Sequence, residues 1–383
     1  MDKLKTDIQA TLFRLEENEH FRDSIGNFDA QYCERRWESP LYYPIADQTL
    51  IAADPAWLTE LVWPDGKTFA ACLSHDVDTL RFGSRVELIR KIFQEARYSE
   101  KLARKMKIYS SVIGLRRPPN KTDIFTPWIN LEKKYGFHST FFFSTSKVSK
   151  RNLRDNVYSL NDRTIYQGRT STGREVIRDL IRQGWDVGLH GSILSALNYD
   201  LLAEQKDDLE EAMGQDVDTV RNHNLMYDHR ITPFIQDKAG FKTDSTIGFN
   251  RDIGFRAGTA YPFRFKNNSQ KTYLDILQIP LIIQDGALMR RDNLDLTEEY
   301  AFRVCRKFID RVAATKGVIT LLWHPDKIIR PGWFHVYERL LEYIHMKNGW
   351  GASLKEVHDW WTNEGLRAKL ERKLENLDIV FSP

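Results

Sequence analysis

Residues 68–78 read TFAACLSHDVD. The first seven, Thr68 to Ser74, are mostly small and apolar, which is typical of a short strand buried on both faces of a parallel sheet. The stretch ends in His75, Asp76 and Asp78, so a buried strand delivers acidic side chains at its carboxyl edge. In parallel α/β folds this edge carries the chemistry, because loops converge there above a rigid floor.

Asp76 and Asp78 are two residues apart, so we expect their carboxylates to lie close together whether the chain stays extended or turns at Val77. Two neighbouring carboxylates are stable in the ionised form when a cation lies beside them, and a metal ion is the simplest candidate. The alternative is a solvated turn in which the aspartates only cap the chain. The stretch alone leaves both interpretations open.

The composition limits the remaining possibilities. At 383 residues, with 42% hydrophobic and 28% charged residues, the chain is long enough for one barrel-type domain with an appendage, or for two ordinary domains. A net charge of +3 is too small to indicate a nucleic acid partner. The three cysteines are far apart and form no CxxC pair, no run of 18 apolar residues occurs, and the first residues lack the apolar core of a signal peptide. We therefore expect a cytoplasmic protein without an integral membrane segment.

Residues 1–65 are expected to form a helical and irregular N-terminal extension that packs on the rest of the chain, with a helix at residues 2–17 and an aromatic, proline-rich stretch at residues 28–65. After residue 66, strands alternate with helices. The predicted strands lie at residues 68–74, 138–143, 185–190, 219–221, 241–247, 277–283 and 318–323. The predicted helices lie at residues 85–106, 123–135, 172–184, 201–213, 233–239 and 297–315. This alternation indicates a βα barrel or an open parallel sheet, and the polar residues that end several strands favour the barrel.

Three histidines follow predicted strands. His190 stands in Gly-Leu-His-Gly-Ser, where the glycines let other groups approach the backbone, and a neutral imidazole there would suit zinc beside Asp78. A hydrogen-bonded histidine at a strand end is the alternative. For His223 the two interpretations are balanced. His324 precedes Pro325 and is placed as expected for a general acid or base.

These motifs together resemble the metal-dependent polysaccharide deacetylases of the carbohydrate esterase type, which carry the NodB homology domain. The resemblance implies a deformed (β/α) barrel of about seven strands at residues 66–361, with residues 362–383 as a C-terminal tail. The acid, spacer, acid motif matches Ser74 to Asp78. By this match, Asp76 would be the general base and Asp78 a metal ligand.

The second motif of the family supplies two histidines one helical turn apart. His190 fits the first position, but Leu194 stands at the second. His223 lies in an Arg-x-His stretch that aligns with the third, arginine-containing motif, and it is the best candidate for the missing ligand. The resemblance implies a divalent metal held by Asp78, His190 and His223, with Zn²⁺ favoured and Co²⁺, Ni²⁺ or Mn²⁺ as alternatives.

Within this family the chain is similar to a subgroup associated with bacterial surface-polysaccharide synthesis. The motifs shared with that subgroup are SHDVD at 74–78, GLHGS at 188–192, DST at 244–246, GFRAGT at 254–259 and LxH at 322–324. They imply a hydrolase that removes an N-acetyl or O-acetyl group from a carbohydrate that is free, nucleotide-linked or lipid-linked.

In the expected mechanism, His324 would protonate the leaving amine, and Arg256 or Arg221 would orient Asp76 through a bidentate contact. The alternative for each arginine is to pair with another acid. We place Arg256 with the catalytic residues, and Arg221 and Trp323 with the substrate-binding residues. Two other functions stay open. A glycan- or metal-binding protein on a degenerate, non-catalytic barrel would suit the missing second histidine, and a small-molecule amidohydrolase acting on a cyclic amide would use the same chemistry.

Overall fold

The computed structural model of the protein describes residues 42–80, 122–145, 155–156, 158–267, 269–377 and 379. The helices predicted at residues 2–17 and 85–106 lie outside the described residues, as does most of the N-terminal extension. The account below concerns the described residues.

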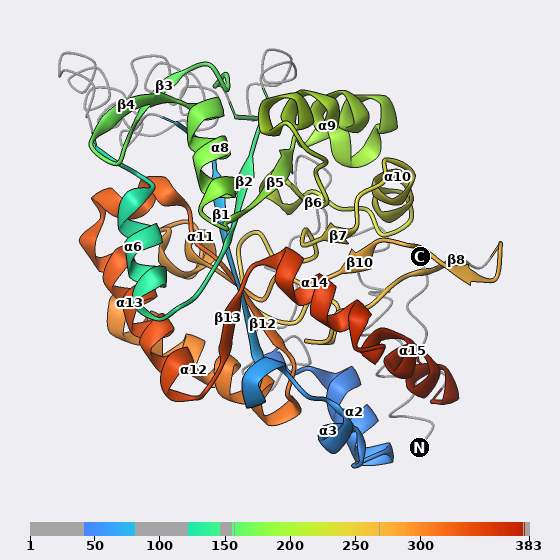
Figure 1. Cartoon of the computed structure of the whole chain (residues 1–383). Helices are drawn as coiled ribbons and strands as arrows, with labels where there is room; N and C mark the ends of the chain where they lie inside the picture. Colours follow the sequence, from blue (N-terminus) through green and yellow to red (C-terminus); the bar gives the residue numbers. More distant parts are fainter. Residues whose placement is uncertain are drawn as a thin grey trace.

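Strand β1 (Ala70–Val77) is central to the sheet, and each of its eight residues is buried. It pairs in parallel with β2 (Thr140–Phe143) on one side and with β12 (Val318–Leu322) on the other. The sheet order is β10-β7-β6-β5-β2-β1-β12-β11, and β13 (Trp350–Ala352) also pairs with β1. The remaining strands are β5 (Asp186–Gly191), β6 (Thr219–Asn222), β7 (Thr243–Asp244), β10 (Leu277–Gln278) and β11 (Ile283–Gln284). The sheet curls into a deformed parallel barrel (Figure 1), which confirms the predicted fold class.

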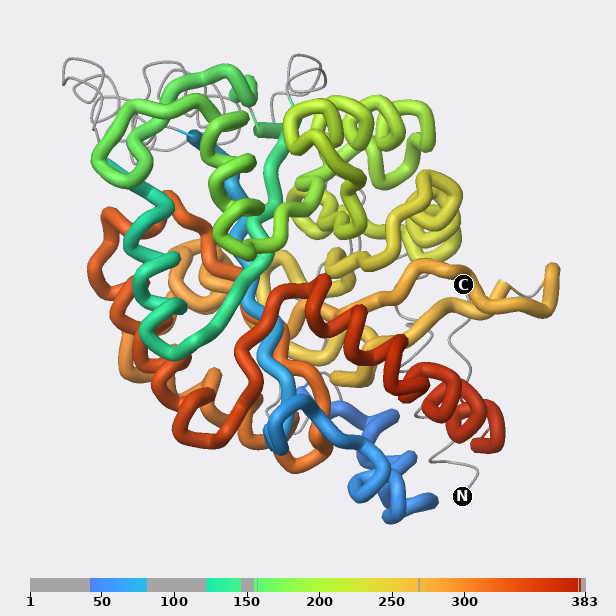
Figure 2. The backbone as a smooth tube through the Cα atoms, in the orientation of Figure 1, coloured from blue at the N-terminus to red at the C-terminus, as the bar shows by residue number. Residues whose placement is uncertain are grey.

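Helices surround this sheet, as the backbone trace in Figure 2 shows. They are α6 (Thr126–Lys134), α8 (Gly173–Arg182), α9 (Tyr199–Met213), α10 (Thr232–Lys238), α11 (Asp285–Met289), α12 (Glu298–Thr315), α13 (Pro331–Met346), α14 (Leu354–Asn363) and α15 (Leu366–Asn376). Thr172 and Ser353 form capping boxes that fix the first turns of α8 and α14. None of the described helices is long and apolar enough to cross a membrane.

The sequence did not predict α13, α14 or α15. Helix α15 lies within residues 362–383, the predicted C-terminal tail. Its Leu366, Leu370 and Leu374 recur every fourth residue and are buried against the core, so this part of the segment is a packed helix.

The apolar run at 277–283, predicted as one strand, forms two short strands. β10 pairs with β7, and β11 pairs with β12 at the other end of the sheet. Between them, the backbone N–H of Leu281 donates to Ile247 and that of Ile282 donates to Thr320. The run therefore crosses from one end of the sheet to the other.

The described part of the N-terminal extension is more regular than expected. It contains α2 (Ile45–Ala53), α3 (Trp57–Glu60) and the short 3₁₀ helix η4 (Pro64–Gly66). Trp57 and Trp63 are buried, with Trp57 edge-on to Tyr261 and Trp63 stacked on Trp361. These aromatic contacts attach residues 42–66 to the barrel.

Two β-hairpins lie outside the barrel sheet. One consists of β3 (Arg163–Tyr166) and β4 (Arg169–Thr172), and the other of β8 (Lys266–Asn267) and β9 (Thr272–Tyr273). Three short 3₁₀ helices follow barrel strands, namely η5 (Leu194–Leu197), η6 (His223–Leu225) and η7 (Pro325–Ile329). They turn the chain directly above the carboxyl edge of the sheet.

Candidate functional site

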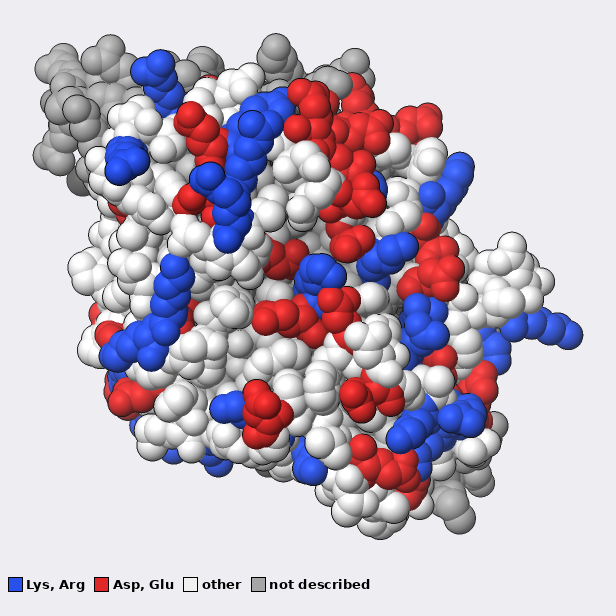
Figure 3. Space-filling model, in the orientation of Figure 1, with Lys and Arg blue, Asp and Glu red and all other residues white. Residues whose placement is uncertain are grey.

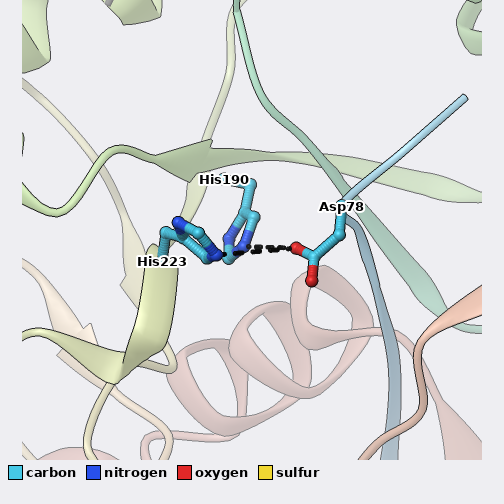
Figure 4. A group of neighbouring side chains, drawn as sticks. All are labelled: Asp78, His190 and His223. Atoms are coloured by element: carbon cyan, nitrogen blue, oxygen red, sulfur yellow. Dashed lines mark ion pairs between the residues drawn. The ribbon is translucent and has the colours of Figure 1, made fainter. Parts of the chain in front are cut away.

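The predicted metal ligands meet at the carboxyl edge of the barrel. Asp78 follows β1, His190 is the fifth residue of β5, and His223 follows β6. One ligand atom of each residue lies within 4.8 Å of those of the other two. Figure 4 shows the three side chains pointing toward a common centre from three different strands. A parallel sheet produces this convergence because its strand ends lie side by side.

Asp78 occupies the middle of this cluster. Its Oδ1 lies 3.5 Å from Nε2 of His190 and 3.9 Å from Nε2 of His223, and its Oδ2 lies 3.6 Å from Nε2 of His324. Burial opposes ionisation of this carboxyl, but the surrounding rings of His324, His190 and His223 hold the pKa of Asp78 well below its usual range. Asp78 is therefore a carboxylate that faces three imidazoles.

The orientation of His190 suits a metal ligand. Its Nδ1 lies 2.9 Å from the backbone carbonyl oxygen of Arg221, which can only accept a hydrogen bond, so Nδ1 carries the proton. The opposite nitrogen, Nε2, is buried and has no hydrogen-bond partner among the described residues, and the same holds for Oδ1 of Asp78. Buried polar atoms are rarely left unpaired. Two such atoms 3.5 Å apart fit the ligand shell of a divalent ion.

Gly188, two residues before His190, has a packing role. A Cβ atom at Gly188 would lie 2.4 Å from Oγ1 of Thr219 and 2.6 Å from the ring of Phe142. Only glycine lets β5 fit between β2 and β6 at this point. The spacing that brings His190 to the centre therefore depends on this residue.

His223, and not the residue at position 194, is the second histidine of the cluster. Leu194 begins η5 and is 48% exposed, whereas His223 is 9% exposed and lies with Asp78 and His190. The residue after it, Asn224, adopts a φ of 55°, in the left-handed region that asparagine tolerates. The chain thus turns immediately after it delivers the imidazole.

Replacement of His223 by alanine should strip most of the metal from the protein, because one of three protein ligands is lost. We expect Zn²⁺ affinity to fall by more than the roughly 10- to 100-fold that removal of a group orienting a ligand causes. Metal analysis after dialysis measures the effect. His335→Ala is the control, since that histidine is largely exposed on α13 and contacts Glu298. Stoichiometric metal in the His223→Ala protein would show that the ligand set is wrong.

Asp76 lies beside this cluster and is held by Arg221. The Asp76 side chain is nearly fully buried, Nη1 of Arg221 donates to its Oδ1 at 2.9 Å, and its Oδ2 lies 3.9 Å from Nε2 of His190. Arg221 also donates to Oγ of Ser74 and lies over the ring of Phe142, which fixes its guanidinium from several sides. One oxygen of Asp76 is thus bound to an arginine while the other faces the histidines.

The prediction that Arg256 or Arg221 orients Asp76 fits Arg221, whereas the prediction that Arg221 binds substrate is contradicted by its burial. Arg221 is fully buried and contacts Asp76, so it orients this carboxylate and has no exposed surface for a substrate. Arg256 is also buried, and its Nη1 donates to the carbonyl oxygen of Gly248 at 3.0 Å. The contact that holds Asp76 therefore comes from Arg221, not from Arg256.

The prediction that Trp323 binds substrate is also wrong in this structure. Its side chain is fully buried, its Nε1 donates to the carbonyl oxygen of Trp333 at 3.1 Å, and its ring packs 5.2 Å from that of Tyr337. The strand period explains this, because neighbouring side chains point to opposite faces. When His324 turns toward the site, Trp323 turns into the core.

His324 faces Oδ2 of Asp78, whereas His190 and His223 face Oδ1 of the same carboxylate. Its Nδ1 contacts Oδ1 of Asp285 at 2.6 Å, and its backbone N–H donates to Oδ2 of the same carboxylate at 2.9 Å. Burial alone would lower the pKa of His324, but the carboxylates of Asp285 and then Asp78 outweigh it and raise the pKa to about 9. At neutral pH the ring is a proton donor aimed at the site.

Comparison with known proteins supports the fold. No family model and no curated protein matches the sequence. Among solved structures, a protein described as a polysaccharide deacetylase from Mycobacterium smegmatis aligns over 78% of this chain and 92% of its own, with a TM-score of 0.52 and 17% identity. Another so described, from Pseudomonas aeruginosa PAO1, aligns over 79% and 93%, with a TM-score of 0.51 and 16% identity. The fold is that of the polysaccharide deacetylases.

The same NodB-type barrel fold also occurs in a protein named for a different activity. The structure of Puue allantoinase aligns over 79% of this chain and 92% of its own, with a TM-score of 0.51 and 14% identity. At such identities the similarity concerns the architecture. The activity has to be inferred from the side chains at the carboxyl edge of the barrel.

Two residues of the candidate site were not predicted from the sequence. Asp285 directly follows β11 and pairs with His324, and Asp155 lies in a polar segment after β2 and contacts Nδ1 of His223. The position of Asp285 at the end of an apolar strand is the same signal that identified Asp76, so it could have been found. Asp155 follows no predicted strand, and no local pattern marks it.

Proposed function

We propose that this protein is a metal-dependent hydrolase that removes an N-acetyl or O-acetyl group from a sugar. The observation that carries the proposal is the contact of one carboxylate, Asp78, with three imidazoles, beside a second carboxylate, Asp76, that Arg221 holds in place. Ligands, a base and a proton donor thus occupy one small volume. Hydrolysis of an amide or ester needs this combination.

Each side chain has a separate task in the proposed reaction. Bound by Asp78, His190 and His223, a divalent ion would polarise the acetyl carbonyl and lower the pKa of the attacking water. Asp76 takes the proton of that water as it attacks the carbonyl carbon. His324 then gives its proton to the leaving nitrogen or oxygen, so that acetate and the free amine or alcohol are released.

For the substrate we propose an acetylated sugar of the kind used to build bacterial surface polysaccharides, acted on in the cytoplasm. The sequence motifs shared with the corresponding deacetylase subgroup support this role. Two structural neighbours described as polysaccharide deacetylases support only the coarser proposal of an acetylated carbohydrate substrate. On the face drawn in Figure 3, acidic and basic side chains are interspersed, and acidic ones gather over α9. Together with a net charge of +3, this gives no support to a nucleic acid partner.

A cyclic amide is the second candidate substrate, because the allantoinase structure aligns as well as the deacetylases do. Its hydrolysis would use the same base and proton donor on a ring amide in place of an acetyl group. A non-catalytic barrel is the third possibility. The presence of Asp76, Arg221 and His324 together in one site argues against it.

One assay separates these functions. The Zn²⁺-loaded protein is incubated with N-acetyl and O-acetyl sugars in free, nucleotide-linked and lipid-linked form, and acetate release is measured alongside ring opening of cyclic ureides. We expect acetate release that disappears after chelation and returns with Zn²⁺. Ring opening without acetate release would favour the amidohydrolase. No turnover of either class by protein that holds stoichiometric metal would contradict a catalytic role.

A further inference from the structure

Asp155 links two loops at the candidate metal centre. It is 2% exposed, and its Oδ1 accepts a hydrogen bond from the backbone N–H of Ile193 at 2.9 Å. The same oxygen lies 3.1 Å from Nδ1 of His223. Asp155 also lines a small polar cavity beside His190. One carboxylate oxygen thus joins the turn after β5 to the imidazole after β6.

This contact fixes which nitrogen of His223 is available to a metal. A carboxylate oxygen only accepts hydrogen bonds, so Nδ1 of His223 must carry the proton. In the neutral ring the lone pair is then on Nε2, the atom that lies 3.9 Å from Oδ1 of Asp78. At His190 the backbone carbonyl of Arg221 has the same effect. The two rings therefore present equivalent nitrogens, one set by the main chain and the other by a side chain.

His223 needs such an anchor because it comes from a separate strand. A ligand one helical turn after His190 would be positioned by the backbone that carries His190, but Leu194 stands there and is 48% exposed. Nδ1 of His223 has its contact with Asp155, a residue distant in sequence. Because Asp155 also binds Ile193, it ties His223 to the loop that contains Leu194.

We propose that Asp155 is the positioning residue that makes His223 a metal ligand. The inference rests on the proposed function, since it concerns the same centre. Asp155 touches neither substrate nor metal in this scheme. It acts by holding the ring of His223 in the tautomer and orientation that a ligand beside Asp78 and His190 requires.

The first test uses the metal-free protein. Two-dimensional ¹H–¹⁵N spectra of the imidazoles report which ring nitrogen is protonated, and comparison with His223→Ala identifies the His223 signals among those of the ten histidines. We expect Nδ1 of His223 to be protonated in the wild type. In Asp155→Ala the acceptor is gone, so the protonation should shift toward Nε2. An unchanged His223 spectrum in Asp155→Ala would overturn the inference.

The second test measures Zn²⁺ affinity by competition with a chromophoric chelator. We expect Asp155→Ala to bind about 10- to 100-fold more weakly than the wild type, and Asp155→Asn to lie between them because its amide oxygen still accepts a hydrogen bond. Asp162→Ala is the control. This aspartate lies in the same segment but is exposed, and it accepts from the backbone N–H of Ser159. Equal affinity of the wild type and both Asp155 variants would overturn the inference.

A double-mutant cycle distinguishes positioning from general stabilisation. If Asp155 acts through His223, Asp155→Asn should not weaken Zn²⁺ binding further in a His223→Ala background. An equal loss in both backgrounds would contradict the inference. Should Asp155→Ala not fold, as judged by thermal unfolding, the Asn variant decides, and unchanged affinity there overturns the inference. A wild type that bound no Zn²⁺ would instead refute the proposed function, while the imidazole spectra would still decide the role of Asp155.

Discussion

Replacement of Asp76 by asparagine should reduce turnover by about 10²- to 10⁴-fold, the usual contribution of a general base, while metal content stays at the wild-type level. The asparagine keeps the shape of the side chain and an oxygen that can accept from Arg221, as Oδ1 of Asp76 does at 2.9 Å. It cannot take a proton from water. The three proposed ligands are unchanged in this variant. Metal analysis should therefore give the wild-type content, while acetate release should be largely lost.

Asp186→Asn is the matched control for this prediction. Asp186 begins β5 at the end opposite to His190 and accepts a hydrogen bond from Oγ1 of Thr140 at 2.7 Å. Its replacement also removes a strand-borne carboxylate, but outside the site, so turnover should change little. Loss of metal from Asp76→Asn would mean that Asp76 is a ligand, and full activity would mean that the base lies elsewhere.

Replacement of His324 by alanine should reduce the hydrolysis of N-acetyl substrates by about 10²- to 10⁴-fold and that of activated phenyl esters far less. An amine is a poor leaving group unless it is protonated, whereas a phenolate departs without a proton. His324 is placed to supply that proton, because its ring is held by Asp285 and its Nε2 lies 3.6 Å from Asp78. Steady-state rates on matched amide and ester substrates measure the difference. Equal losses on both would exclude the role as proton donor.

The Asp285 partner provides a pH test of the same role. Its carboxylate helps to raise the pKa of His324 to about 9, so the donor form persists above neutral pH and is lost as the pH rises through that value. In Asp285→Asn the negative charge is absent and the pKa of His324 should fall toward its ordinary value. The basic limb of the pH–rate profile should then move to lower pH. A limb that does not move would contradict this assignment.

Much of the barrel could be predicted because characteristic residues precede and follow its central strands in the sequence. The predicted strand at 185–190 corresponds to β5 at Asp186–Gly191, and the one at 318–323 to β12 at Val318–Leu322. In each case an apolar run begins after a glycine-containing turn and stops at a polar site residue. The same few residues therefore show both the apolar pattern of a buried strand and the polar residue of the site.

Other parts depend on contacts that a linear pattern does not contain. The stretch at 241–247 is predicted as one strand, but only Thr243–Asp244 pair as β7, because pairing depends on the neighbouring strand. Helix α13 begins with Pro331 and Gly332, which resemble a loop. Asp155 bonds to Ile193 and His223, far away in sequence, so its role emerges only when the barrel is closed.

The crossing of residues 277–284 from β7 to β12 has a consequence for motion. β10 and β11 have two residues each, so the barrel is joined there by a seam much shorter than the eight-residue β1. Segments with few ladder hydrogen bonds open at low free-energy cost, so the amide hydrogens of Leu277 and Ile282 should exchange with solvent faster than those of β1. Equal protection factors would disprove this. Since Asp285 directly follows β11, each opening of the seam should draw its carboxylate away from His324, the proton donor of the proposed reaction.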